Sequence, residues 1–414
     1  MEKSIIKMIL KWTLIVTGIL ASIYTIIVIA LLITIKNTKG DSPAGKANWV
    51  LKESQKSIPC AKKDLSVPVY TTPEGIKFVR TPEDRFKNLS GYSFKANYIN
   101  INGLRMHYVD EGPKNGQVIL LLHGQPSWSY LYRKMIPPLA QAGHRVIAVD
   151  LIGLGKSDKP VKMAIHTFEN HVTWIKKFIK TKNLKNITLV CQDWGSIIGL
   201  RIAGDQSHLF SRIVAANGTL PVFKKGQNRL RVLNPVAINC DLKNRPPWKS
   251  SLRNLVYSSF RSKLPQVIQK SIRIISFQKW VTYALTAPDI SAARVVEFAT
   301  VNTLTKEELR AYDAPYPSLI YKAAIRTLPS MAAAIGEHNL NAWNNLGKFK
   351  KPFLFLAGDH DTNLGSKKNQ NKFIKHVPGA KGQAHERYNA HHFIQEDVGE
   401  LLAQKVVKFI RDNT

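Results

Sequence analysis

Short uninterrupted apolar runs recur along the middle and the end of the chain, and segments of helical length separate most of them. An apolar run without alternation indicates a strand that is buried on both faces, as in a parallel sheet covered by helices. The runs are Val118–Leu122, Val146–Val149, Ile187–Val190, Ile213–Ala216 and Phe353–Ala357. The pattern therefore predicts an α/β fold with a mostly parallel sheet flanked by helices.

Two further patterns lie before and after these runs. Residues Tyr98–Asp110 alternate between apolar and polar positions, which is typical of an antiparallel hairpin. Near the C-terminus, residues Glu396–Ile410 carry an apolar stripe of helical period that includes Leu402 and Phe409. We expect the hairpin to lead into the sheet and the last helix to pack on it.

The alternation of strands and helices stops between residues 219 and 347. Helical patterns occur in this interval around residues 264–275 and 292–298, between turns that are rich in proline. Since the interval lies between two core strands, we interpret residues 219–347 as an inserted helical cap. The α/β core is then divided into a first part, residues 78–218, and a second part, residues 348–414.

The N-terminal region contains one long apolar segment. Residues Trp12–Ile35 form an uninterrupted run of uncharged and mostly apolar positions. A helix over this run, at about 1.5 Å per residue, would span a hydrocarbon core of about 30 Å. We therefore predict a single-pass membrane anchor within residues 1–40, in contact with a lipid bilayer, and a linker over residues 41–77. Lysines flank the run on both sides, so its orientation stays open.

The distribution of charge bears on nucleic-acid binding, and the number of cysteines bears on disulfide bonds. The formal net charge is +32, from 60 Lys and Arg against 28 Asp and Glu. The basic residues are spread along the whole chain and are not interleaved with aromatic residues, so we do not expect a nucleic-acid partner. Three cysteines cannot build a disulfide framework. Cys191 belongs to a motif described next, and pairing of Cys60 with Cys240 stays open.

The segment Cys191–Ser196 follows one apolar run and precedes a helical pattern. Small residues stand two positions before Asp193 and two and three positions after it, which is the spacing of a sharp strand-to-helix turn that exposes its central side chain. Such a turn is a nucleophile elbow, and here the nucleophile is a carboxylate. An aspartate is ionised at neutral pH without help from a base, so a base in the site is free for a later step.

A second polar motif, His123–Pro126, ends the run Val118–Leu122. In a fold of this kind the loop after that strand supplies one backbone N–H of an oxyanion hole, here from Gln125. The residue after the nucleophile, Trp194, supplies the other. Alone the motif is equally compatible with a simple turn, but its position two strand–helix units before the elbow favours the oxyanion hole.

The second part of the core offers a base and an acid. His391 and His392 stand just before the last helix, and one of them would reach the elbow. An acid that orients this histidine should follow the run Phe353–Ala357, where Asp359 and Asp361 stand. The order nucleophile, acid, base along the chain matches the hydrolase order.

Five longer motifs stand along the chain: Arg80–Phe86, Leu104–Gly112, His123–Arg133, Gln192–Gly195 and His392–Glu396. Together they resemble the haloalkane dehalogenases of the α/β-hydrolase superfamily, over roughly residues 78–414. In the subfamily that the chain most resembles, a Gly-x-x-Asp-x-x-Leu-Gly pattern carries the acid, which selects Asp361. A Gly-His-Phe-x-Gln-Glu pattern carries the base, which selects His392. The resemblance implies an α/β-hydrolase fold and hydrolytic dehalogenation.

The mechanism that the resemblance implies needs no cofactor and no metal. Asp193 would displace a halide from a saturated carbon, and the indole N–H groups of Trp194 and the cap residue Trp280 would hold the anion. Water activated by His392, which Asp361 orients, would then hydrolyse the alkyl ester. The expected partners are a small halogenated organic substrate and water, and the expected assembly is a monomer.

The chain departs from the family pattern in three places. Ser196 stands where the family usually has a second glycine, and Gln125 stands where the subfamily often has glutamate. The segment Val222–Ser276 is longer and more basic than the usual beginning of a cap.

Two other functions stay open from the sequence. An epoxide hydrolase shares the fold and the aspartate nucleophile but uses cap tyrosines as acids, and the predicted cap contains four candidates. These are Tyr283, Tyr312, Tyr316 and Tyr321. A membrane-tethered binding protein with an inactive hydrolase core would also keep this fold.

Overall fold

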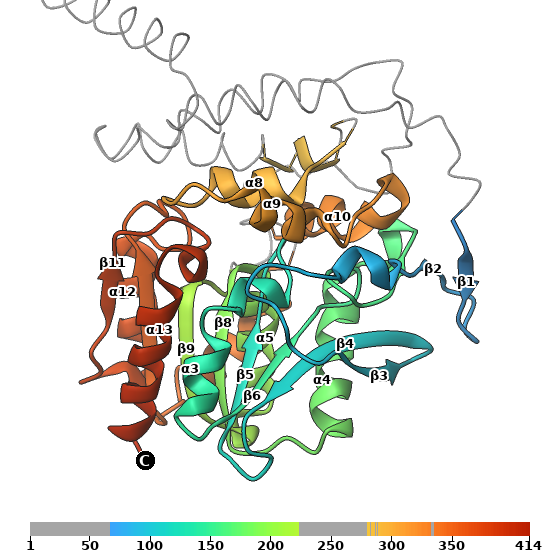
Figure 1. Ribbon diagram of the computed structural model, residues 1–414. Coiled ribbons are helices and arrows are strands. Elements are labelled where there is room, and N and C mark those ends of the chain that lie inside the picture. Colours follow the sequence, from blue (N-terminus) through green and yellow to red (C-terminus); the bar gives the residue numbers. More distant parts are fainter. Residues whose placement is uncertain (1–66, 223–279, 282, 286, 288, 333–334) are drawn as a thin grey trace, which may run out of the picture.

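The computed structural model describes residues 67–222 and 280–414, except residues 282, 286, 288 and 333–334. These residues form a central sheet of eight strands with helices on both faces (Figure 1). The strands of this sheet are β3 (Asn97–Ile101), β4 (Leu104–Glu111), β5 (Val118–Leu122), β6 (Arg145–Val149), β8 (Ile187–Gln192), β9 (Phe210–Gly218), β10 (Phe353–Gly358) and β11 (Glu386–Tyr388). The described helices are α3 (Ile136–Gln141), α4 (Phe168–Thr181), α5 (Asp193–Asp205), α8 (Ala292–Phe298), α9 (Lys306–Asp313), α10 (Ala323–Met331), α11 (Leu340–Leu346), α12 (Lys367–His376) and α13 (Ile394–Arg411). The predicted α/β fold is confirmed.

The strand order of the sheet is β11-β10-β9-β8-β5-β6-β4-β3. Neighbours from β6 to β11 pair in parallel, whereas β4 pairs antiparallel with both β6 and β3. Each predicted apolar run is a strand of this sheet, and the predicted hairpin is β3–β4. Strand β11 was not predicted, because its residues Glu386–Tyr388 are half-buried, two of them are charged, and they contain no apolar run.

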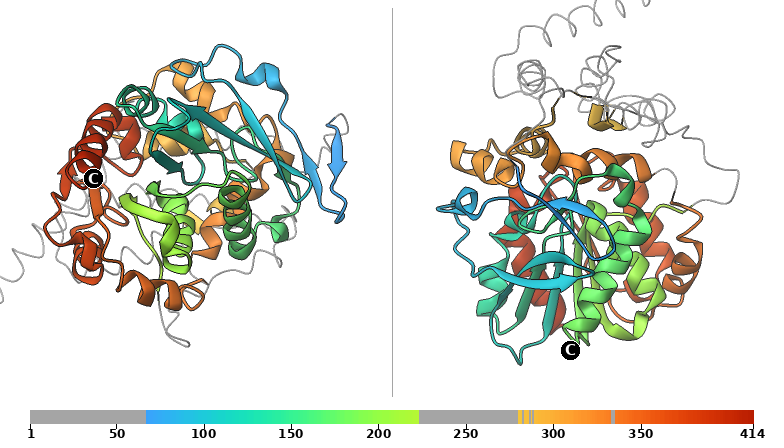
Figure 2. Two further views of the ribbon diagram at one scale, coloured as in Figure 1. Left: turned by 90° about the horizontal axis from the view of Figure 1, so that it is seen from below. Right: turned by 90° about the vertical axis from the view of Figure 1, so that its right-hand side faces the viewer.

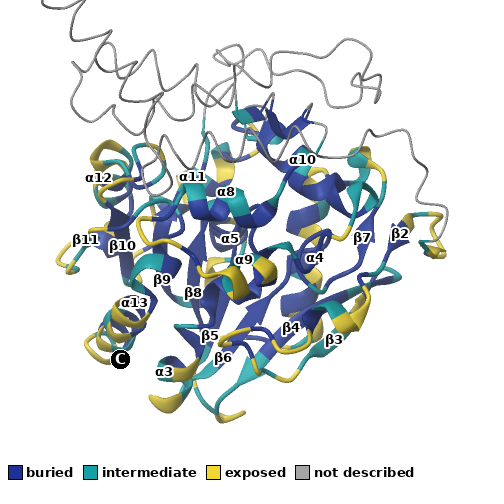
Figure 3. Cartoon of the chain, turned by 45° about the horizontal axis from the view of Figure 1, so that its top comes forward, coloured by how far each residue is buried: buried dark blue, intermediate teal, exposed yellow. Residues whose placement is uncertain are grey.

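A separate apolar cluster lies on each face of the sheet, beneath helices that Figure 2 shows from two further sides. On one face, Phe178 of α4 and Ile198 of α5 belong to the same cluster as Phe373 of α12. On the other face, Leu139 of α3 and Val406 of α13 belong to the second cluster. The inner strands of the sheet, β4 to β6 and β8 to β10, are buried along most of their length (Figure 3). The last helix therefore packs on the sheet as predicted.

Helices α8 to α11 follow β9 and precede β10, so they belong to a segment inserted between two core strands. In Figure 1, α8, α9 and α10 lie together on one side of the sheet, above the strands. The buried Gln125 Nε2, in the loop after β5, donates to Ile325 O of α10 at 2.7 Å. The predicted cap segment 223–279, with its helical pattern around 264–275, lies outside the described residues.

A small second sheet adjoins the core near the first described residues. It contains β1 (Val69–Thr71), β2 (Lys77–Val79) and β7 (Lys159–Pro160), in antiparallel pairs. The end of the predicted linker therefore contains a strand, which at three exposed residues is too short to show an alternating pattern. Residues 41–66 of that linker, with Cys60, lie outside the described residues.

The prediction of a membrane protein needs correction. The predicted anchor, residues Trp12–Ile35, lies outside the described residues, and no helix in the described part of the chain is long and apolar enough to cross a membrane. The longest of the described helices, α13, carries charged residues such as Glu400 and Lys405 between its apolar positions, as expected for a helix that packs on a sheet. We therefore withdraw the membrane localisation and the lipid partner.

Candidate active site

The predicted elbow is the junction between β8 and α5. Strand β8 ends at Gln192 and α5 begins at Asp193, whose φ of 48° is in the left-handed region that aspartate tolerates better than most residues. A Cβ atom at Gly195 would lie 2.0 Å from the carbonyl oxygen of Leu122, and one at Gly124 would lie 2.2 Å from Asp193 Oδ1. Glycine at these two positions lets the carboxylate sit directly against the loop after β5.

The Asp193 carboxylate lies between an amide donor and a histidine. The backbone N–H of Gln125 donates to Asp193 Oδ1 at 2.8 Å. On the other side, Asp193 Oδ2 is 3.5 Å from His392 Nε2. The Asp193 side chain is 15% exposed, so this carboxylate is not sealed within the protein.

The second part of the core supplies the residues around the histidine ring. His392 Nδ1 lies 2.8 Å from Asp361 Oδ2. The other oxygen, Asp361 Oδ1, accepts hydrogen bonds from the backbone N–H groups of Asn363 and Leu364 at 2.9 and 3.0 Å. These bonds hold the carboxylate in the loop after β10 and, through it, the orientation of the imidazole.

The two other candidates lie elsewhere. Asp359 is exposed and forms an ion pair with Arg387 at 2.7 Å. His391 Nδ1 accepts a hydrogen bond from the backbone N–H of His392. The structure thus brings Asp193, His392 and Asp361 together and directs the side chain of Asp359 to a different partner.

The charges of this trio depend on one another. Burial lowers the pKa of His392, but the neighbouring Asp361 and Asp193 outweigh burial and raise that pKa to about 10. Burial raises the pKa of Asp361, but its contact with His392 outweighs this effect and leaves the pKa below its usual value. The neighbouring carboxylates of Asp361 and Asp193 thus favour the protonated form of the histidine.

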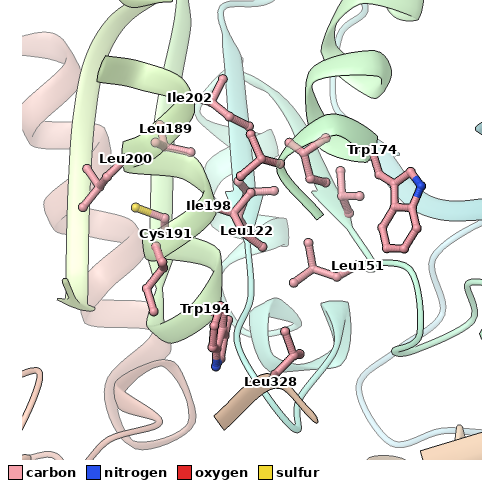
Figure 4. Packing of buried hydrophobic residues seen from close by; sticks show 14 of the residues in the cluster. Leu122, Leu151, Trp174, Leu189, Cys191, Trp194, Ile198, Leu200, Ile202 and Leu328 are labelled. Carbon is pink, nitrogen blue, oxygen red and sulfur yellow. The ribbon is translucent and has the colours of Figure 1, made fainter. Parts of the chain in front are cut away.

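The two tryptophans border the same apolar cluster. Trp194 is almost fully buried in the first turn of α5, and its indole nitrogen points away from Ile202 of that helix (Figure 4). Trp280 is partly buried against the same cluster, and its ring stacks on Tyr283 with centroids 5.9 Å apart. Leu328 of α10 is also a member, so this cluster extends from the core into the cap.

Some residues near the histidine were not expected from the sequence. Asn217, at the end of β9, donates from Nδ2 to the carbonyl oxygens of His391 and His392 at 2.7 and 3.1 Å. Its Oδ1 accepts from the backbone N–H of Gly358 at 2.8 Å. Gln192 Nε2 lies 3.1 Å from both Nε2 and the carbonyl oxygen of His392. A signal existed for Asn217, because it directly follows a predicted strand, as the other site motifs do.

Ser196 has a defined place in the elbow. Its Oγ donates to the carbonyl oxygen of Asp193 at 2.6 Å and accepts from the backbone N–H of Thr219 at 2.8 Å. A Cβ atom at Gly218 would lie 2.8 Å from Ser196 Cβ, so glycine at 218 leaves room for the serine. The hydroxyl therefore joins the elbow to the segment that follows β9.

Comparisons with known proteins agree with the fold and indicate a family. The chain matches the α/β hydrolase fold family over residues 117–397. A haloalkane dehalogenase from Mycobacterium marinum is 39% identical over 341 residues, which are 80% of this chain and 99% of that protein. One from Psychrobacter cryohalolentis is 37% identical over 350 residues, or 82% of this chain and 99% of that protein. The structure of haloalkane dehalogenase DpaA from Paraglaciecola agarilytica is similar with a TM-score of 0.62 at 29% identity, and the match covers 80% of this chain and 97% of that one. The chain therefore belongs to the α/β hydrolases and, among them, to the haloalkane dehalogenases.

Proposed function

We propose that the protein converts haloalkanes to alcohols in two steps, through a covalent alkyl ester on Asp193. The placement of the carboxylate supports this proposal most directly. One of its oxygens accepts from the N–H of Gln125 at 2.8 Å, and the other lies 3.5 Å from His392 Nε2. A nucleophile next to both an amide donor and a potential base has the groups that each step needs.

In the first step, the Asp193 oxygen that Gln125 does not hold attacks the saturated carbon. The new C–O bond forms as the carbon–halogen bond breaks, and the halide leaves with the electron pair. We propose that the indole N–H groups of Trp194 and Trp280, which can only donate, hold the departing anion. Their position on one apolar cluster supports this assignment, because a site with little water strengthens a hydrogen bond to an anion.

In the second step, His392 takes a proton from water, which attacks the ester carbonyl carbon. Asp361 holds the imidazole and stabilises its cation, while the backbone N–H groups of Gln125 and Trp194 donate to the oxygen that becomes negative. The tetrahedral intermediate then releases the alcohol and restores the carboxylate. Alkylation removes the charge of Asp193, which lowers the pKa of His392 towards the range in which it acts as a base.

The main alternative is an epoxide hydrolase with the same nucleophile. That reaction needs cap tyrosines whose hydroxyl groups can donate to the epoxide oxygen. The buried Tyr312 OH instead donates to Glu396 at 2.5 Å, and the buried Tyr316 OH donates to the carbonyl oxygen of Pro126 at 3.2 Å. Two of the four candidate hydroxyl groups are thus engaged within the protein, and the related proteins are haloalkane dehalogenases, so dehalogenation is the better-supported function.

Product analysis separates the possible functions. The full chain should release bromide and butanol from bromobutane, and Asp193→Ala should release neither while its circular dichroism spectrum stays unchanged. Diol formation from epoxides without bromide release would favour the alternative. A folded protein without activity on either class of substrate would indicate a binding protein with an inactive core.

The predicted oligomeric state differs from that of one related protein. The sequence predicts a monomer, whereas the related dehalogenase from Paraglaciecola agarilytica is described as tetrameric. We propose the monomer as the working hypothesis, and light scattering after size-exclusion chromatography gives the mass that tests it. The proposed partners are the halogenated substrate and water, and the proposed reaction uses neither a cofactor nor a metal.

A further inference from the structure

The segment that carries the catalytic base lies between the core and the cap. We call residues 391–393 the histidine loop. On the core side, Asn217 donates to the carbonyl oxygens of His391 and His392. On the cap side, the backbone N–H of Phe393 donates to the carbonyl oxygen of Ala299, in the loop after α8, at 3.1 Å. The backbone of the histidine loop is therefore held from two directions.

The carboxylate of Asp397 adds a second connection to the cap. Its Oδ2 accepts from the backbone N–H of His391 at 2.8 Å. Its Oδ1 accepts from the backbone N–H groups of Val301 and Asn302 at 2.9 and 3.0 Å. All three partners are donors and cannot bond to one another, so the two carboxylate oxygens of Asp397 join the histidine loop to the cap loop, residues 299–302.

The local geometry of α13 makes this connection important. Val398 departs from helical geometry with φ −139° and ψ 35°, so a kink separates the first turn of α13 from the rest of the helix. The helix behind the kink therefore does not dictate the orientation of this turn. Its own contacts do so: Asp397 bonds to the cap loop, and the buried Glu396 bonds to Arg133 at 2.6 Å and to Tyr312 of α9.

We propose that Asp397 is a positioning residue for the base: it joins the histidine loop to the cap loop, so that the place of His392 beside Asp193 depends on the docked cap. The inference rests on the proposed function. Asp397 touches neither the nucleophile nor the substrate and acts through His391. The base is needed only for ester hydrolysis, so loss of Asp397 should slow the second step and leave the first step nearly unchanged.

Separate measurement of the two steps tests the proposal. In Asp397→Ala, rapid-quench bromide release from bromobutane, which reports alkylation, should stay within about 3-fold of the wild type. Hydrolysis of the ester should slow by about 10-fold or more, because a small displacement of a base from its reacting position has effects of this size. The ester should then accumulate on Asp193, where intact-protein mass spectrometry detects it. Asp397→Asn keeps one acceptor oxygen and should show a smaller defect.

The same helix provides a matched control. Glu400 is exposed one turn further along α13, so Glu400→Ala removes the same charge without these contacts and should leave both rates unchanged. Equal slowing of both steps in Asp397→Ala, or an unchanged rate of hydrolysis, would overturn the proposal. Loss of the folded state in both Asp397 variants would assign a purely structural role and would overturn it equally.

Failure of the proposed function gives a different result. His392→Phe should accumulate the ester even with Asp397 intact. If neither the wild type nor His392→Phe forms an ester on Asp193, the covalent mechanism itself is wrong. If His392→Phe forms the ester and Asp397→Ala hydrolyses it at the wild-type rate, only the positioning role of Asp397 is refuted.

Discussion

Replacement of Ser196 by alanine removes the hydroxyl group that joins the elbow to the segment after β9. Ser196 Oγ donates to the Asp193 carbonyl oxygen at 2.6 Å and accepts from the Thr219 N–H at 2.8 Å. The lost bond and the unpaired N–H together cost about 2 kcal/mol. Alanine recovers about 0.5 kcal/mol through its higher helix propensity. Ser196→Ala should therefore lower the free energy of unfolding by about 1.5 kcal/mol.

The same contacts predict the stability of a Ser196→Gly variant. Ser196→Gly restores the residue that is usual in the family, but it loses the same hydrogen bonds. It also costs about 0.5 kcal/mol more in helix propensity than serine does. The expected loss is therefore about 2.5 kcal/mol. The order of stability should be serine, then alanine, then glycine.

Urea unfolding followed by circular dichroism measures both variants. Ser90 is exposed, so Ser90→Ala is the control and should change the free energy of unfolding by less than about 0.5 kcal/mol. A Ser196→Ala protein as stable as the wild type would refute the reasoning, because the hydroxyl group would then have no net effect on the elbow. A glycine variant that is more stable than the alanine variant would refute it as well.

Three further predictions concern the charge of His392, the space beside Gly124 and the hydrogen bond between Tyr312 and Glu396. Burial lowers the pKa of His392, but adjacent carboxylates raise it to about 10, against about 6.5 in an unfolded chain. The contribution of protonated His392 to the free energy of unfolding should therefore be complete below pH of about 6.5 and should be lost as the pH rises through about 10. Urea unfolding of the wild type, compared with His392→Gln, measures this contribution. Gly124→Ala places a Cβ atom 2.2 Å from Asp193 Oδ1 and should reduce bromide release by about 100-fold in a folded protein. Tyr312→Phe removes the bond to Glu396 and should lower the free energy of unfolding by about 1–2 kcal/mol, measured with urea.

Each of these predictions has an outcome that contradicts it. A stability difference between wild type and His392→Gln that stays constant up to pH of about 10 would show that folding does not raise the pKa of the histidine. Wild-type activity of Gly124→Ala would show that the loop can move away from the carboxylate. A Tyr312→Phe protein with an unchanged unfolding midpoint would show that the bond to Glu396 has no net effect on stability.

The core strands could be predicted because burial on both faces leaves an uninterrupted apolar run in the sequence. The run Val118–Leu122 has the same bounds as β5. Strand β11 could not be predicted, because an edge strand of three half-buried residues leaves no such run. The same reason applies to β1, whose residues Val69–Thr71 are exposed on a small separate sheet. Apolar pattern thus reveals a strand only when burial is extensive.

The residues of the candidate site could be identified in part from the sequence. Asp193 was identified from the small residues around it, because a tight turn imposes its spacing locally. The choice of Asp361 and His392 over their neighbours required a family resemblance. The contacts of Asn217 and Asp397 join residues 174 and 96 positions apart. No local spacing encodes such contacts, so the residues that hold the backbone around His392 became visible only in the folded chain.

The side chain of Gln125 has a consequence for the dependence of the fold on pH. Its Nε2 group donates to the carbonyl oxygen of Ile325 in α10 at 2.7 Å, while its backbone N–H donates to Asp193 Oδ1 at 2.8 Å. A glutamate at this position could make the same bond only as the neutral acid, since an ionised carboxylate has no proton to donate. The amide needs no such proton. Acidic and alkaline media should therefore leave this hydrogen bond between the cap and the loop after β5 intact, for as long as the surrounding chain stays folded.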